Sequence, residues 1–319
     1  MARLELLSKI NNIFVANAQK GNNVDVFILL DNNANEVHQT FWKYDYSDSL
    51  FEGFDADKLV KYAYKKINAK DPDTSDKIKF RARIEEPGQD HFQVVGKVIP
   101  VEDKIILNQK RDGANKQAHN DAGVEPASVR FQNNMRWLAG LRDCVKWVQD
   151  VEFEQGIFYD LVIRLRDDTL AFGPWILTPE KYLLGLTSAR TGSFRGINDH
   201  NFVIDRKWAD TLFRGFTEDY YFNKTLSQEM WGNPEHRIFQ LASANNIPIR
   251  NTSICEQPLM PLRGKFNESH WLMHAAYTKK FREECDDPKT RKIDNCVCPK
   301  EWYKMFASGT CSFDYDFRH

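Results

Sequence analysis

Hydrophobic residues in the first hundred positions recur with the periods of strands and of helices. The continuous apolar run at 24–31 predicts a buried parallel strand, which is how doubly wound folds commonly begin. Residues 57–69 place apolar side chains at helical spacing, and 77–84 and 91–99 each predict one strand. No Gly-x-Gly-x-x-Gly motif follows the first strand, which disfavours a nicotinamide-dependent enzyme. The pattern predicts an α/β fold.

The segment at 159–175 joins an apolar strand to a dense cluster of charge. Strand side chains alternate between two faces, so here one face is aliphatic while the other collects two arginines and a carboxylate. The first face carries Leu161, Ile163 and Leu165, and the second carries Val162, Arg164, Arg166 and Asp168. Ligands of open α/β sheets bind beyond the carboxyl ends of strands, and guanidinium groups bind phosphate, so this strand predicts a phosphorylated ligand. The alternative is a solvated strand end whose arginines pair with Asp160, Asp167 and Asp168.

Separate blocks of the sequence together resemble one known family. The strand motif, Tyr-Asp followed by an apolar stretch and Arg-x-Arg-x-Asp, is similar to the strand of GT-A-type glycosyltransferases that ends in their acidic metal and nucleotide-sugar motif. The blocks 196–213 and 233–249 resemble the acceptor-side half of such enzymes, where a Gly-x-x-Asp segment precedes a helix and a Pro-Glu helix leads into a last strand. A helix predicted at 130–148 is a weaker element of the same resemblance, which covers residues 130–250.

This resemblance implies a fold, a reaction and a division of the chain. Residues 1–265 would form a GT-A-like, Rossmann-like mixed sheet flanked by helices, with 266–319 as a cysteine-rich C-terminal extension packed on it. The enzyme would move a sugar from a nucleotide diphosphate sugar to a hydroxyl of a carbohydrate or glycoprotein acceptor. The rival from another class is a catalytically inactive carbohydrate- or nucleotide-binding protein on the same scaffold, because a fold does not establish activity.

The resemblance also implies which residues bind the donor. Asp168 would hold a metal or the donor sugar, and Arg164 and Arg166 the diphosphate region. The family's usual Asp-x-Asp is here Arg166-Asp167-Asp168, so an arginine replaces the first carboxylate and weakens the expectation of Mn²⁺ or Mg²⁺. Asp167 could substitute, but on an extended strand it points away from Asp168. Arginines that neutralise the diphosphate could replace the metal.

Two further carboxylates are candidates for the acceptor side. Asp199 precedes a strand-like stretch, and an inverting transferase needs a base within hydrogen-bond reach of the acceptor hydroxyl. His200 competes for that role, and a simple Asn-Asp turn is the structural alternative. Glu235 follows Pro234 in the first turn of a predicted helix, where an acid either favours the helix dipole or, by the resemblance, faces a sugar.

Charge and hydropathy exclude several partners. Lys plus Arg number 44 and Asp plus Glu 45, so bulk electrostatics gives no support to nucleic-acid binding. No window approaches about 18 consecutive apolar residues, which predicts no membrane span, and the first twenty residues lack a signal-peptide pattern. Either the protein is cytosolic, or an anchor lies upstream of residue 1.

Cysteine usage favours the secretory pathway, meaning the Golgi lumen or secretion. Four of the six cysteines fall in the last 35 residues, in a segment rich in Asp, Lys, Pro and Asn, which predicts disulfides on a loop-rich tail. They are Cys285, Cys296, Cys298 and Cys311. Glycosylation sequons occur at Asn223, Asn251 and Asn267, but about two would arise by chance. A cytosolic nucleotide-binding protein with free cysteines is the alternative.

Overall fold

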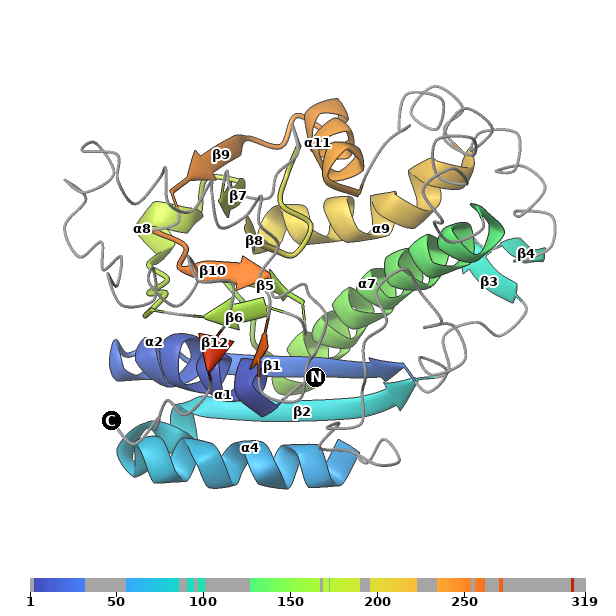
Figure 1. Ribbon diagram of the computed structural model, residues 1–319. Helices are drawn as coiled ribbons and strands as arrows, with labels where there is room; N and C mark the ends of the chain where they lie inside the picture. Colours follow the sequence, from blue (N-terminus) through green and yellow to red (C-terminus); the bar gives the residue numbers. More distant parts are fainter. Residues whose placement is uncertain are drawn as a thin grey trace.

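The structure is a computed structural model (Figure 1), and its fold is mixed α/β. It describes residues 3–31, 56–85, 91–94, 97–100, 127–166, 169–171, 173–189, 196–222, 234–253, 256–261, 270–271 and 311–312. The α-helices are α1 (Arg3–Lys9), α2 (Ala16–Gln19), α4 (Ala56–Lys70), α7 (Ala127–Gln155), α8 (Pro179–Tyr182), α9 (Arg206–Phe222) and α11 (Pro234–Ala244). The strands are β1 (Val24–Asp31), β2 (Ile78–Glu85), β3 (His91–Val94), β4 (Lys97–Pro100), β5 (Leu161–Leu165), β6 (Thr169–Ala171), β7 (Leu186–Ala189), β8 (Asn201–Asp205), β9 (Ile249–Thr252), β10 (Leu259–Pro261), β11 (His270–Trp271) and β12 (Cys311–Ser312).

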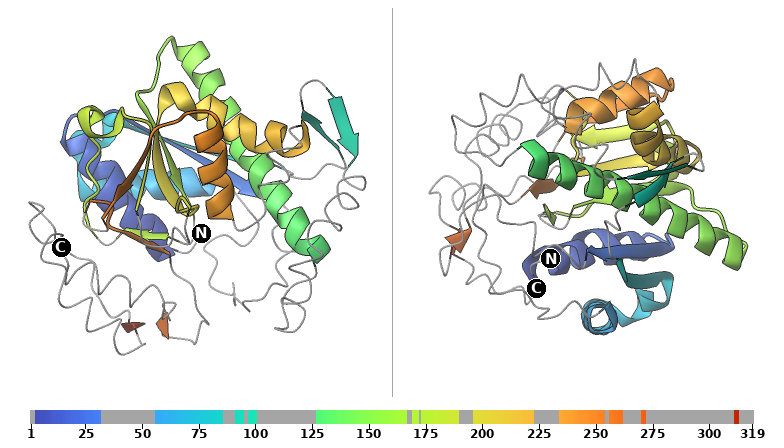
Figure 2. Two further views of the ribbon diagram at one scale, coloured as in Figure 1. Left: turned by 90° about the horizontal axis from the view of Figure 1, so that it is seen from above. Right: turned by 90° about the vertical axis from the view of Figure 1, so that its right-hand side faces the viewer.

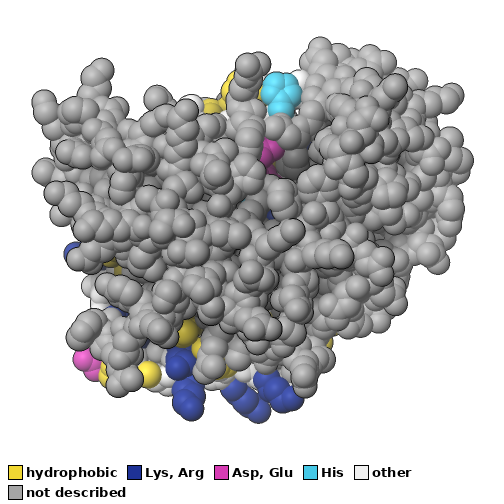
Figure 3. Space-filling model, in the orientation of Figure 1, with side chains coloured by type: hydrophobic (Ala, Val, Ile, Leu, Met, Phe, Trp, Pro, Cys, Tyr) yellow, Lys and Arg dark blue, Asp and Glu magenta, His cyan; other side chains and the backbone are white. Residues whose placement is uncertain are grey.

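The N-terminal part contains the predicted parallel strand and helix. β1 pairs with β2 in parallel from Val24↔Ile78 to Asp31↔Glu85, and α4 provides the crossover between them. Parallel strands need such a long connection, so the β1–α4–β2 order follows from their direction. The lysines of α4 face solvent, and Figure 3 shows basic side chains gathered along the lower edge of the molecule, where Figure 1 places α4. Residues 91–99 were predicted as one strand, and this prediction is wrong.

These residues belong to a hairpin instead. β3 and β4 pair antiparallel, with Val94 opposite Lys97. Val95 and Gly96 separate the two strands in the sequence, and a two-residue connection that contains glycine is a common hairpin signal. The alternation of apolar residues continues through both strands, which is why periodicity alone did not reveal the turn.

The central element of the second half is a four-stranded mixed sheet in the order β5-β8-β7-β9. β8 runs antiparallel to both β5 and β7, while β7 and β9 are parallel. Leu165, the last residue of β5, lies opposite Asn201, the first residue of β8. The carboxyl end of β5 is therefore next to the loop that carries Asp199.

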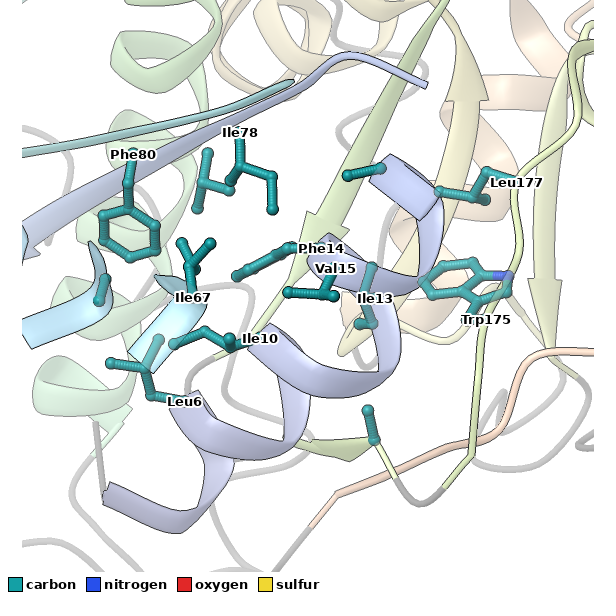
Figure 4. Close-up of a cluster of buried hydrophobic side chains, with 14 of the residues drawn as sticks. Leu6, Ile10, Ile13, Phe14, Val15, Ile67, Ile78, Phe80, Trp175 and Leu177 are labelled. Atoms are coloured by element: carbon teal, nitrogen blue, oxygen red, sulfur yellow. The ribbon is translucent and has the colours of Figure 1, made fainter. Parts of the chain in front are cut away.

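Hydrophobic clusters cover both faces of this sheet, and the residues of β5 divide between them as strand alternation predicts. Leu161, Ile163 and Leu165 pack against a first cluster built from the N-terminal helices, α4, β1 and β2 (Figure 4). Val162 packs against a second cluster formed by α7, α9, α11, β7 and β8. Figures 1 and 2 accordingly show α4 and α11 at opposite ends of a layered arrangement.

Local residues set where α9 and α11 begin and where α11 ends. The Asp205 carboxylate accepts a hydrogen bond from the Lys207 N–H at 3.1 Å, which caps the start of α9. Pro234 is the first residue of α11, where a missing N–H costs nothing. The helix is followed by Asn246 at φ 54°, a left-handed conformation that asparagine tolerates better than most residues.

A buried ion pair joins the long helix α7 to the start of α9. Arg206 at the start of α9 donates two hydrogen bonds to Glu152 of α7, at 2.9 and 2.7 Å. Burial disfavours the charged guanidinium, but the hydrogen bonds to Glu152 and Asp210 outweigh it and raise the pKa of Arg206. Glu152 also accepts from the Tyr159 N–H just before β5, so one carboxylate fixes where β5 starts.

The C-terminal region contributes only short described pieces. β11 and β12 pair antiparallel, with Trp271 opposite Cys311. Cys285, Cys296 and Cys298 lie outside the described residues, so the disulfides and the boundary at 265 stay predictions. Asn251 is exposed on the edge strand β9, while Asn223 and Asn267 also lie outside the described part. None of the described helices is long and apolar enough to cross a membrane.

Candidate functional site

The candidate site lies at the carboxyl end of β5, where Arg166 meets Asp199. The Arg166 Nη1 atom is 3.2 Å from Asp199 Oδ2, and the side chains are 27% and 5% exposed. The backbone N–H of Arg166 donates to the His200 carbonyl at 2.9 Å, so the strand end and the loop before β8 are joined through main chain and side chain together. This geometry brings together two of the residues singled out in the sequence.

The Asp199 loop is held by an internal turn. Asn198 accepts a hydrogen bond on Oδ1 from the His200 N–H at 2.9 Å, which is the self-bonded turn considered as the structural alternative. Its own N–H donates to Ser188 Oγ at 3.0 Å, which ties the loop to β7. The turn therefore belongs to Asn198, whereas the Asp199 carboxylate is directed at Arg166. His200 is fully buried, with Nε2 3.5 Å from Asp199 Oδ1.

Glu235 enters the same region from the first turn of α11. Its carbonyl accepts a hydrogen bond from the Ile197 N–H at 2.9 Å, and its side chain is buried at 5% exposure. A Cβ atom on Gly196 would lie 2.1 Å from that carbonyl oxygen, so only glycine allows this approach. The two sequence blocks on the acceptor side thus meet at Gly196 and Glu235.

Lys9 is one further charged residue of this region, and no motif in the sequence singled it out. Its Nζ donates to the Arg166 carbonyl at 2.6 Å across 157 positions of sequence, and the residue is 2% exposed. An ammonium group is costly to bury unless it is hydrogen-bonded, so this contact is specific. The available signal was its spacing, because Lys9 falls on the same helical stripe as the buried Leu6 and Ile13.

The N-terminal helical segment also shapes the chain that follows the strand motif. Asn12 donates to the Ala171 carbonyl and Asn17 to the Trp175 carbonyl, both at 2.7 Å. The Leu177 N–H donates in return to Asn17 Oδ1 at 2.8 Å. Asn12 lies within a π-helical turn at Ile10–Val15, a rare geometry that is frequent at functional sites, and Asn17 follows in α2. Residues far apart in sequence therefore build the surroundings of β5 together.

The remaining donor-side predictions are only partly described. Arg164 donates from Nη1 to the Leu165 carbonyl at 2.9 Å, so part of its guanidinium bonds its own strand. Asp167 and Asp168 lie outside the described residues, and the structure does not test their roles. Within the described ranges, no group of three His, Cys, Asp or Glu side chains could hold a metal ion.

Comparison of the chain with known protein families, with curated proteins and with solved structures finds no match. The resemblance to GT-A-type glycosyltransferases therefore stays a prediction from the sequence blocks quoted above. The geometry around Arg166, Asp199, Glu235 and Lys9 is the structural basis for a function.

Proposed function

We propose that this protein is a glycosyltransferase that moves a sugar from a nucleotide diphosphate sugar to a hydroxyl of a carbohydrate or glycoprotein, on a GT-A-like scaffold. One observation carries the proposal. The Arg166–Asp199 ion pair lies at the carboxyl end of a sheet strand, with Glu235 entering beside the same loop. The separate sequence blocks that carry the family resemblance thus supply neighbouring charged residues at one strand end, where α/β sheets bind ligands.

The cations at this strand end suit a diphosphate leaving group. Arg166 presents a planar guanidinium with five N–H donors, a geometry that suits phosphate oxygens as well as the Asp199 carboxylate. Lys9 adds a fixed positive charge at the Arg166 carbonyl. Preorganised cations stabilise the negative charge that develops as the bond between the sugar and the diphosphate breaks. The proposal also includes Asp168, which would hold Mn²⁺ or Mg²⁺ and so add positive charge beside the diphosphate.

Asp199 is the proposed base on the acceptor side. In a single displacement, the acceptor oxygen bonds to the anomeric carbon, the diphosphate leaves with the bonding pair, and the hydroxyl proton passes to a carboxylate. Arg166 contacts Oδ2 of Asp199 and thereby orients the carboxylate, while Oδ1 is directed towards His200. His200 is the alternative base, and Glu235 would bind a sugar hydroxyl.

A binding panel followed by a transfer assay tests the proposal. The melting temperature is measured with a panel of nucleotide sugars, with and without Mn²⁺, and any stabilising donor is then incubated with simple saccharides. We expect at least one nucleotide sugar to stabilise the protein and to yield a transferred product by mass spectrometry. Stabilisation without a product from any acceptor would favour the inactive binding protein, and no stabilisation at all would overturn the proposal.

Arg250 provides the matched control for a substitution of Arg166 at the donor site. Arg166→Ala should weaken binding of the nucleoside diphosphate more than binding of the nucleoside, because the lost contact is to phosphate. Arg250 is also in an ion pair, with Glu256 at 3.0 Å near the edge strand β9, but it lies away from β5. Arg250→Ala should therefore leave both affinities unchanged. Equal weakening of both ligands by Arg166→Ala would argue against a phosphate contact.

A further inference from the structure

Asn201 carries a buried amide that the proposed reaction does not use. It is the first residue of β8 and is 0% exposed, and within the described part of the chain neither Oδ1 nor Nδ2 has a hydrogen-bond partner. Nearly all buried polar groups in folded proteins are hydrogen-bonded, so a side chain with both atoms unsatisfied points to a partner that the chain itself does not supply.

A second buried amide reaches the same residue. Gln257 is 1% exposed, and its Nε2 donates to the Asn201 carbonyl at 3.1 Å. Its Oε1 is unsatisfied within the described part, and its own carbonyl accepts from the N–H of Leu259, the first residue of β10. The start of β8 is thus flanked by unsatisfied acceptors and one unsatisfied amide donor. Both side chains are neutral.

Asn201 is close to the charged site in the sequence and across the β5–β8 pair. Asn201 follows Asp199 by two residues, and it faces Leu165 across the β5–β8 pair, directly before Arg166. Cross-strand partners point to the same side of a sheet, so Asn201 shares the side on which Leu165 packs against the N-terminal cluster. Lys9, which donates to the Arg166 carbonyl, comes from that same cluster of elements.

We infer that Asn201 and Gln257 form a hydroxyl-binding subsite that takes the transferred sugar of the nucleotide donor. An amide offers both a donor and an acceptor, as a sugar hydroxyl does, and its neutrality favours a polyol over a phosphate or a carboxylate. Arg166 would then bind the diphosphate, Lys9 would add positive charge nearby, and the amides would bind the sugar. This inference rests on the proposed function and adds which residues recognise the transferred sugar.

The test separates the contribution of the sugar to binding affinity from the contribution of the nucleotide. Binding of a nucleoside diphosphate and of the matching nucleotide sugar is measured by calorimetry for wild type and for Asn201→Leu, which removes both amide atoms at similar volume. We expect wild type to bind the nucleotide sugar more tightly, and Asn201→Leu to lose that advantage by at least tenfold while binding the nucleoside diphosphate normally. Asn201→Ala replaces it if the leucine variant does not fold.

Thr187 provides the matched control in the same sheet. Its Oγ1 is also buried and unsatisfied, at 1% exposure on β7, but the residue pairs with Val203 further along β8. Removing either unsatisfied group should leave the melting temperature unchanged or raise it, because no protein hydrogen bond is lost. Thr187→Val should keep the full preference for the nucleotide sugar.

The outcomes distinguish a failure of the sugar subsite from a failure of the proposed function. An unchanged preference in Asn201→Leu, or an ordered water that satisfies these amides while the nucleotide sugar is bound, would overturn the subsite and leave the proposed function standing. If wild type binds no nucleotide sugar, the proposed function fails, and free monosaccharides then test the subsite alone. A stabilisation by a monosaccharide that Asn201→Leu abolishes would support the subsite, and its absence would overturn it.

Discussion

Arg166 and Asp199 are 33 residues apart in the sequence and meet at 3.2 Å between Nη1 and Oδ2. The contact joins the end of β5 to the loop before β8, and the carboxylate is almost completely buried while the guanidinium is partly exposed. A charge held in this way is oriented before any ligand arrives, which is what electrostatic preorganisation requires. The pair therefore has both a structural and a proposed catalytic consequence.

Asp199→Asn should separate these two consequences. A general base contributes typically about 10² to 10⁴ in rate, so we expect turnover to fall by that factor while donor affinity stays nearly unchanged. Unfolding by urea should report a loss of about 1–2 kcal/mol, because asparagine still accepts one hydrogen bond from Arg166 but lacks the charge. Wild-type turnover in the folded variant would transfer the base role to His200 or Glu235, or indicate a retaining mechanism.

Gly196→Ala should disturb the contact between the Asp199 loop and α11. The added Cβ would lie 2.1 Å from the Glu235 carbonyl oxygen, so backbone must move, and we expect a loss of about 2–3 kcal/mol in the free energy of unfolding.

Gly140 is the control for this substitution, because its added Cβ would meet only a Leu29 methyl group at 3.8 Å. Gly140→Ala lies inside α7 and should stabilise the protein by up to about 1 kcal/mol through helix propensity. If Gly196→Ala were as stable as wild type, the close approach to Glu235 would be wrong.

Arg206→Met should be strongly destabilising, because it leaves Glu152 buried without its cation. Breaking a buried ion pair from one side costs about 3–5 kcal/mol. Lys207 is the neighbouring control, since it pairs with Asp205 but is 62% exposed, and Lys207→Met should cost less than about 1 kcal/mol. Chemical denaturation of both variants checks the difference. The double variant Arg206→Met/Glu152→Gln should lose less than the sum of its single changes, because no buried unpaired charge remains at position 152.

Tyr159 should make the fold sensitive to alkaline pH. Burial, followed by the hydrogen bond from the phenol to Asp25, raises the pKa of Tyr159 above its usual value of about 10. The folded protein keeps the proton while the unfolded chain releases it, so stability is complete below about pH 10 and falls as pH rises above it.

The dependence of unfolding free energy on pH between about 10 and 11.5 measures this effect. In Tyr159→Phe, the unfolding free energy should decline less steeply with pH than in wild type. The two slopes should differ by less than about 1.4 kcal/mol per pH unit, because the Tyr159 ring is partly exposed. Burial also raises the pKa of Tyr182, so Tyr159→Phe should retain part of the decline and Tyr182→Phe should remove that part. Identical slopes in wild type and Tyr159→Phe would contradict the assignment.

Local patterns along the chain predicted much of the fold. The alternation at 161–165 separated the residues that pack on the two sides of β5, because strand geometry alone sets that separation. The caps at Asp205 and Pro234 were also readable, since they satisfy backbone groups within a few residues. The hairpin at 91–100 was missed because two short strands with one alternation look like one longer strand.

Only the tertiary structure decided which residues form the candidate site. Sequence named Arg166, Asp199 and Glu235 separately, but whether they meet depends on the order β5-β8-β7-β9 and on where α11 packs. Lys9 and Gln257 could not be assigned from local pattern, because each makes its contact across many residues of chain, with the Arg166 and Asn201 carbonyls. Periodicity and capping depend on residues only a few positions apart, so they can be recognised from the sequence alone. Side-chain partners of high sequence separation are chosen by packing, which no local pattern contains.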